Sequence, residues 1–422
     1  MLRQKALGLV AALTFALAGC EREADTVEAN LPYADEYPSI GYASAHPEGR
    51  LGRFADAVDD GDLRLAWNED RGYLDSVLDA LQIDTSSQVL VYSRTSVQVG
   101  GITPQTPRAI YFNDDTYVAW IPAARTLELA SYDPQLGPVF YRVMQDPTVA
   151  QTTPRQFGTC LRCHDTYSLS GGGVPRFLLG SGYTGSDGEL VSHEAWILTT
   201  QGTPFKNRWG GWYVTGHHGN AVHLGNIVVQ NPEDLQDLES LRVGNIDDLS
   251  GLFDTSKYLR PTSDIVALLV IEHQVEVQNL ISRLLFESGS ADSPAPEGLA
   301  EHIDALVQAM LMLDEAELPA PVEGGSGFAE HFETQGPFDS SGRSLRQLDL
   351  KTRLFRYPLS YLIYSDAFAA LRPDVKKAVL ARIETVLKAT PEQDGYTRLS
   401  TQDRKAITGI LAETLPDFSS AP

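Results

Sequence analysis

Cysteine is scarce in this 422-residue chain, which has only Cys20, Cys160 and Cys163. Three thiols cannot build a disulfide-stapled small domain. A structural zinc site is also disfavoured, because it takes four ligands and no fourth cysteine exists. The fold must therefore rest on an apolar core, and 42% hydrophobic residues are ample for this length.

The chain also has few positively charged residues and few long apolar runs. The chain has 33 Lys and Arg against 56 Asp and Glu, a net charge of −23. Such a surface disfavours nucleic acid and anionic lipid and attracts a partner with a basic docking surface, although it also serves solubility. After residue 20 the longest apolar run is Ile265 to Ile271, which ends at Glu272. We therefore expect no membrane span beyond the leader.

The first 20 residues predict an export signal with a lipid anchor. Arg3 and Lys5 precede an apolar run from residue 6 to 16, and Leu-Ala-Gly-Cys20 closes it. Small residues before a cysteine resemble the bacterial lipobox, which implies that Cys20 is lipidated and becomes the mature N-terminus. An ordinary signal peptide is the alternative. By the same resemblance, Glu21 favours the outer membrane over the inner one, on the periplasmic side of a bacterial envelope.

Hydrophobic periodicity divides the rest of the chain into regions. We expect an acidic tether over 21–50 and a helix plus β-meander region over 51–150. A loop-rich segment with many Gly, Trp and His residues follows over 151–250, and a mainly helical region over 251–422. Within the meander, Asn113 to Thr116 is a hairpin turn between two strands. The predicted fold class is α+β.

The pentapeptide Cys160-Leu161-Arg162-Cys163-His164 is the strongest chemical signal. Two thiols at this spacing can add to the two vinyl groups of a haem, and the adjacent histidine can bind its iron. A thioredoxin-like redox pair would require a βαβ pattern, which is not found around this segment. The pattern predicts one covalent haem c, with Cys160 and Cys163 as attachment points and His164 as an iron ligand.

From residue 157 to 176 the chain resembles class I cytochromes c. That resemblance implies that Pro175 helps to place a carbonyl acceptor for the other ring nitrogen of His164. Arg176 is a candidate for binding a haem propionate, or else a surface arginine. Class I cytochromes supply a distal methionine downstream, whereas this chain has only Met144 before the motif and a distant pair in a predicted helix. The whole chain resembles larger exported single-haem proteins, which implies no particular reaction.

A histidine is therefore the expected sixth iron ligand, with His218 first and His273 second. His218 lies in a glycine-rich loop, with His217 and His223 as lesser candidates in the same stretch. His273 lies on the apolar stripe of a predicted long helix, so a core histidine with a hydrogen-bond partner is the alternative. Aromatic residues at 209, 212 and 213 could form a wall of the haem site or pack within a hairpin.

The sequence favours a periplasmic or outer-membrane-tethered mono-haem cytochrome that transfers electrons to or from a redox partner protein. Two other functions stay open. One is a haem enzyme with an open distal side that acts on peroxide or another small ligand, since carrying one electron needs far less chain. The other is a haem-based binding or sensing module. We expect membrane contact through the N-terminal lipid only, and no nucleic-acid partner.

Overall fold

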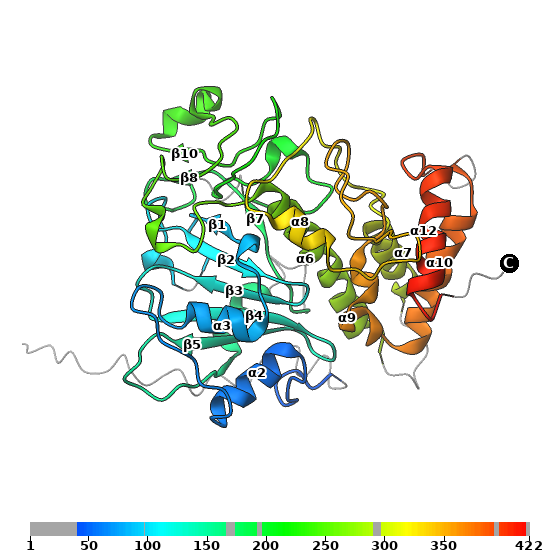
Figure 1. The fold of residues 1–422 in the computed structure, drawn as a ribbon, viewed down its shortest axis with the longest axis horizontal. Coiled ribbons are helices and arrows are strands. Elements are labelled where there is room, and N and C mark those ends of the chain that lie inside the picture. Colours follow the sequence, from blue (N-terminus) through cyan, green and yellow to red (C-terminus); the bar gives the residue numbers. More distant parts are fainter. Residues whose placement is uncertain are drawn as a thin grey trace, which may run out of the picture.

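A computed structural model describes residues 40–96, 98–165, 174–191, 196–289, 297–391 and 396–418. The predicted leader, Cys20 and most of the tether lie outside these ranges. Within them the chain is α+β, as predicted, with a six-stranded antiparallel sheet and mostly helices after it. Figure 1 shows the sheet on the left and α7, α10 and α12 on the right.

The main sheet is a meander in sequence order. Its strands are β1 (Val89–Val91), β2 (Arg108–Phe112), β3 (Thr116–Trp120), β4 (Thr126–Asp133), β5 (Gly137–Met144) and β6 (Arg155–Gln156). Two small two-stranded sheets follow, one of β7 (Gly180–Ser181) and β9 (Ile197–Leu198), the other of β8 (Thr184–Gly185) and β10 (Val228–Val229). The predicted hairpin is confirmed: Asn113 Oδ1 accepts from the N–H of Thr116, which closes the β2–β3 turn.

The described helices are α2 (Arg50–Asp59), α3 (Leu74–Leu81), α4 (Gly158–His164), α6 (Ile265–Glu287), α7 (Leu299–Met310), α8 (Phe328–Glu333), α9 (Asp366–Ala369), α10 (Pro373–Lys388) and α12 (Thr401–Thr414). The sequence predicts one helix near 367–388, but the structure has two there, because Pro373 begins a new helix, as proline readily does at a first turn. Each face of the main sheet is covered differently. Helices α2 and α3 pack on one face, and Figure 1 shows them in front of the sheet.

The other face of the sheet carries Tyr117 and Phe140, which lie in one row because both pair with Ala130. Helix α6 covers part of this face: Tyr117 donates to Gln278 Oε1 at 2.6 Å. Phe177, which follows the Cys-x-x-Cys-His motif in the chain, packs against both Tyr117 and Phe140. The motif and α6 therefore share one face of the sheet.

Helix α6 is the centre of the molecule. The sequence predicts that Thr262 or Ser263 caps this helix. The N-cap is instead Asp264, whose Oδ1 accepts from the N–H groups of Val266 and Ala267. Ser263 instead bonds Leu90 and Tyr213. By length and composition α6 could cross a membrane, contrary to expectation, but 83% of its most apolar stretch is buried in the protein. It is the only such helix among the described residues.

Hydrogen bonds join segments that lie far apart in the sequence. Asp264 Oδ2 accepts from the N–H groups of Gly325 and Ser326. The hydroxyl of Ser326 donates to the carbonyl of Ser86, 240 residues earlier. The core is therefore built from segments far apart in sequence.

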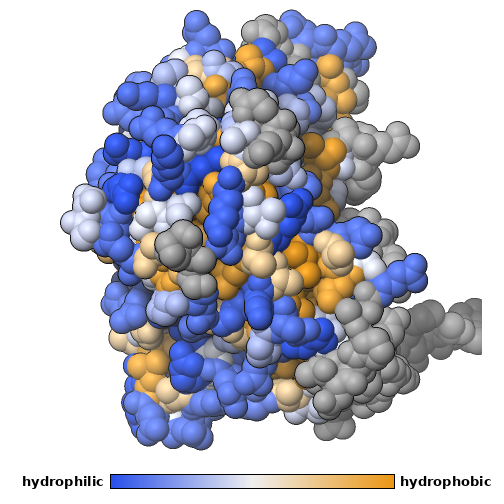
Figure 2. Space-filling view, turned by 90° about the vertical axis from the view of Figure 1, so that its right-hand side faces the viewer, coloured by the Kyte–Doolittle hydropathy of each residue, from blue (hydrophilic) through white to orange (hydrophobic). Residues whose placement is uncertain are grey.

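Figure 2 shows the face at the C-terminal helices, where hydrophilic residues dominate and hydrophobic ones gather between them.

Candidate functional site

Helix α4 presents the two motif cysteines on one face. It directly follows β6, and Leu161 anchors it in the core at 3% exposure. Cys160 and Cys163 are three positions apart and so lie one above the other on the helix. Neither forms a disulfide; Cys160 is half-buried and Cys163 is exposed. Two free thiols one turn apart suit attachment to one edge of a planar group.

His164 is held in one orientation by the segment that follows the motif. Its Nδ1 lies 2.6 Å from the carbonyl oxygen of Arg176, and the N–H of Arg176 donates back to the carbonyl of His164 at 2.9 Å. Pro175, buried, directly precedes this acceptor. Since the carbonyl can only accept, Nδ1 carries the proton and Nε2 the lone pair. Nε2 makes no hydrogen bond to any described residue, so it can bind a metal.

The surroundings of His164 keep the ring neutral. Burial lowers the pKa of His164 to about 4, and the positive charge of Arg108 adds to this shift. The ring of Phe140 packs against the imidazole, with 4.6 Å between centroids. Burial also raises the pKa of Cys160 to about 12, and the negative charge of Glu128 acts in the same direction. At neutral pH the site therefore offers an imidazole lone pair and a protonated Cys160 thiol.

This donor set fits a covalently bound haem c. It comprises two free thiols one turn apart, an imidazole whose Nε2 is free, and the guanidinium of Arg176. The buried Nε of Arg176 has no hydrogen-bond partner among the described residues. No group of three or more His, Cys, Asp or Glu residues suited to a metal ion occurs in the described ranges.

His218 pairs with His223. Both are 4% exposed, and their Nε2 atoms lie 3.2 Å apart. His223 Nδ1 accepts from the N–H of Gly225, so its proton sits on Nε2 and is donated to His218. His218 in turn donates from Nδ1 to the carbonyl of Ala221 at 2.9 Å. Every ring nitrogen of the pair is thus engaged, and both rings are neutral.

His217, the third histidine of this stretch, points elsewhere. It is exposed, and its Nε2 lies 2.8 Å from Asp247 Oδ1. The neighbouring aromatic residues make packing contacts: Trp209 packs on His223 at 5.3 Å between centroids, Trp212 donates from Nε1 to the carbonyl of Gly180, and Tyr213 stacks on Phe253. These residues pack within the protein, but they do not form the expected hairpin: residue 212 pairs with Val91 in an isolated β-bridge.

His273 is a core residue of α6 at 0% exposure. Its Nδ1 lies 2.7 Å from Gln201 Oε1, and its Nε2 lies 2.8 Å from the Ser360 hydroxyl. The amide oxygen can only accept, so Nδ1 carries the proton and Nε2 accepts from Ser360. Burial lowers the pKa of His273 to about 3. The apolar stripe predicted its burial correctly, and both ring nitrogens have partners within the protein.

Helix α6 also sets the separation between His164 and His218. Phe177, next to the carbonyl acceptor of His164, exchanges two hydrogen bonds with Asn279. At the other end, Thr215, three residues before His218, accepts from the N–H of Ile265. Ile265 and Asn279 are 14 residues apart, about 21 Å along an α-helix. The structure therefore brings His218 to His223 and not to His164.

The methionines divide by burial. Met310 and Met312 are 0% and 3% exposed in the core, whereas Met144 is 36% exposed on β5. Met144 shares a strand face with Phe140, four residues earlier. Phe140, Arg108 and Glu128 near His164 were not identified from the sequence. The alternation of side chains along the strands indicates which of these residues share a sheet face. It does not indicate on which face the Cys-x-x-Cys-His motif packs.

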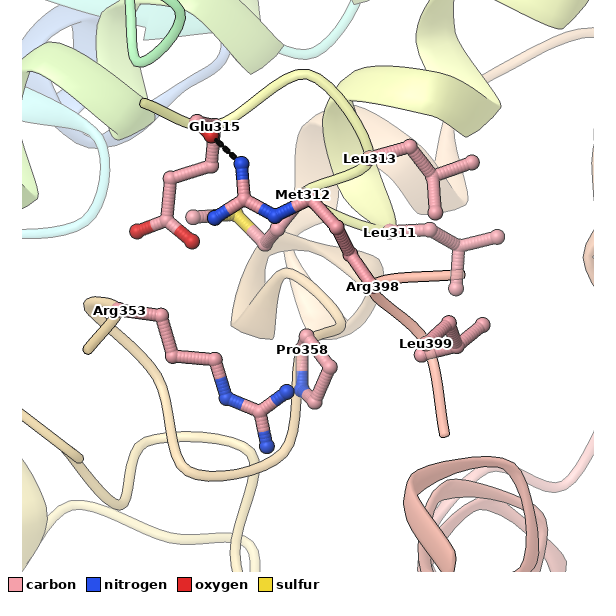
Figure 3. Close-up of a pocket in the computed structure, with 8 residues that line it drawn as sticks. All are labelled: Leu311, Met312, Leu313, Glu315, Arg353, Pro358, Arg398 and Leu399. Carbon is pink, nitrogen blue, oxygen red and sulfur yellow. Dashed lines mark hydrogen bonds between the residues drawn. The ribbon is translucent and has the colours of Figure 1, made fainter. Parts of the chain in front are cut away.

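A small cavity lies far along the chain from these residues. It measures about 10 Å³, room for about one water molecule. Figure 3 shows Glu315 beside it, with the side chain of Arg398 donating to the Glu315 carbonyl and Arg353 across the opening. The lining residues are Leu311, Met312, Leu313, Glu315, Arg353, Pro358, Arg398 and Leu399. None of the predicted site residues lines it.

No protein-family model, curated protein or solved structure matches this chain. The site is therefore interpreted from its own chemistry.

Proposed function

We propose that this protein is a mono-haem c-type cytochrome that transfers electrons in the bacterial envelope. The observation that supports it most is the fixed tautomer of His164, whose Nδ1 bonds the Arg176 carbonyl while Nε2 is free. This is the arrangement expected of an axial histidine, because an acceptor on the second nitrogen orients the ring and raises its basicity. A structural Cys-x-x-Cys pair would not need it.

The chain's own residues would each have a role in holding the cofactor. Cys160 and Cys163 form thioethers, and His164 donates its Nε2 lone pair. The haem supplies an iron that takes up and releases one electron. Phe140 excludes water from one side of the imidazole. The unpaired Nε of Arg176 can donate to a propionate.

The cellular setting is part of the proposal. Lipidation at Cys20 would tether the protein on the periplasmic side, at the outer membrane by preference, with the lipid as its membrane contact. The net charge of −23 would steer a redox partner with a basic surface. Such steering is weakened by salt, so partner reduction rates should fall as ionic strength rises.

A haem enzyme with an open distal side is the second candidate. The observation that favours it is that both ring nitrogens of His218 and both of His273 make hydrogen bonds to other residues. Neither histidine therefore has a nitrogen free to bind an iron. An iron without a strong sixth ligand can bind a small molecule such as peroxide. The size of the chain agrees with this, because large added regions can shape access to such a site.

Spectroscopy of the purified holoprotein separates the two candidates. A pyridine haemochrome assay after acid extraction comes first, and absence of covalent haem would refute both. Six-coordinate low-spin iron that does not react with carbon monoxide supports electron transfer. High-spin iron that binds carbon monoxide readily refutes it in favour of the enzyme.

Histidine variants then locate the sixth ligand. From the contacts above, we expect His218→Ala and His273→Ala to leave a six-coordinate spectrum unchanged. Conversion to five-coordinate iron in one of them would restore that histidine as the ligand and require a different arrangement around the haem. His217→Ala, at an exposed position in the same loop, is the matched control.

A further inference from the structure

Arg108, the first residue of β2, is a buried cation with unused donors. Its side chain is 14% exposed, and among the described residues its buried Nε has no hydrogen-bond partner. Its Nη1 lies 3.5 Å from Glu128 Oε2, at the long limit of a hydrogen bond. A guanidinium has five donors and stays charged when buried. Such a group is costly to bury unless an anion accepts from it.

Glu128 does not supply that anion fully. Both of its carboxylate oxygens accept from the hydroxyl of Ser96, at 2.8 and 3.0 Å, and Oε1 also accepts from Gln98 Nε2 at 3.1 Å. The contact to Arg108 is the longest of these. Glu128 is thus held by the loop before β2, which leaves Arg108 underpaired.

The position of Arg108 points to the haem. Its charge acts on His164, and Glu128 acts on both His164 and Cys160. Glu128 lies two residues before Ala130, which pairs with Phe140, so Glu128 shares the face on which Phe140 packs against His164. A haem bound through Cys160 would lie on this side of the sheet, with its carboxylates as the nearest new anions.

We propose that Arg108 binds a haem propionate and keeps it ionised. This inference rests on the proposed function. A guanidinium and a carboxylate match in a two-point, charge-assisted contact, which offsets the cost of burying Arg108. The proposed contact also predicts a measurable effect on the propionate, because a neighbouring cation holds the pKa of a carboxyl group low.

The test is the midpoint potential of the purified holoprotein as a function of pH. For the wild type we expect a potential that is flat between pH 5 and 8, because the propionate beside Arg108 stays ionised. In Arg108→Gln the potential should be lower near neutral pH, since a positive charge near the iron is lost. It should then rise as the pH falls, because the freed propionate takes up a proton in this range.

Two further variants control the result. Arg125→Gln removes the same charge from an exposed position between β3 and β4, and its potential should stay independent of pH. Arg108→Lys keeps a cation and should restore a flat profile. A flat profile in Arg108→Gln, equal to that of Arg125→Gln, would overturn the inference.

The outcome is separable from failure of the proposed function. If the haemochrome assay finds no covalent haem, the function itself fails before any potential is measured. If haem is present and Arg108→Gln does not fold, Glu128→Gln decides. If a propionate binds Arg108, the folding equilibrium constant of this variant, measured by denaturant unfolding, should stay within about twofold of the wild-type value. A 100-fold or larger decrease in that constant would mean that Glu128 alone stabilises Arg108, which refutes the proposal.

Discussion

The Nε2 atoms of His218 and His223 lie 3.2 Å apart, and the hydrogen-bond partners of their other nitrogens require that His223 donates and His218 accepts. A second proton on His218 would have to occupy the nitrogen that already accepts from His223. The pair is therefore stable only when both rings are neutral.

This pairing predicts acid sensitivity. Burial lowers the pKa of His223 to about 3 and also lowers that of His218. In the unfolded chain both titrate near 6.5, so their contribution to stability is present above that pH and is lost as the pH falls toward 3. Each group can account for up to about 1.4 kcal/mol per pH unit. Urea unfolding at pH 7.5 and 5 should show a shallower pH slope in His223→Leu. An unchanged slope, as expected for the exposed His217→Gln control, would contradict this.

Glu315 predicts the opposite dependence. Burial raises its pKa to about 7, from 4.5 in the unfolded chain, so its contribution is present below pH 4.5 and is lost as the pH rises through 7. In Glu315→Gln the side-chain oxygen can still accept from the N–H of Leu354, without a charge to bury. We expect the variant to gain stability relative to the wild type between pH 5.5 and 8.5. Thermal melts measure this, with exposed Glu317→Gln as the matched control.

The ion pair of Arg208 and Glu272 predicts a large loss of stability when it is broken. The two side chains are 4% and 3% exposed and lie 2.8 Å apart. Glu272→Gln leaves a buried guanidinium that cannot release its proton, which costs about 3–5 kcal/mol in comparable pairs. Glu189→Gln in the more exposed pair with Arg94 should cost about 0–1 kcal/mol. Denaturant midpoints compare the two; equal losses would show that burial of the pair is irrelevant.

The three cysteines predict two separable phenotypes. Cys160→Ala with Cys163→Ala should release the haem to acid acetone, because no thioether remains. Cys20→Ser should keep the covalent haem but lose the lipid, so that the protein leaves the membrane fraction. Fractionation and haem staining of denaturing gels measure both. Haem that stays covalently attached in the double variant would refute the assignment.

Local patterns predicted the elements well, since their causes are local. The turn at Asn113 and the alternation around it are enough to place β2 and β3. The apolar stripe of α6 is enough to bury His273. The N-cap of α6 was missed because Thr262, Ser263 and Asp264 all have side chains that can cap. Only the tertiary contacts of Ser263 show why Asp264 caps the helix.

The partners of the site residues could not be predicted in the same way. Gln201 and Ser360, which bond His273, lie 72 and 87 residues from it in sequence. Arg108 comes near His164 only through the packing of the motif on the sheet. A single sequence carries no signal for such pairings. The loop around His218 and the helix around His273 are visible in the sequence, whereas the partners that occupy their ring nitrogens are not.

The bonds from Gly325 and Ser326 to the start of α6 and to Ser86 have a consequence for how the molecule is made. Contacts between residues 240 positions apart form only after a long loop has closed, which slows folding. Until residues 325 and 326 are synthesised, Asp264 Oδ2 lacks the two N–H donors that it has in the folded protein. We therefore expect the contacts around the start of α6 to be completed late, after residue 326 has been synthesised.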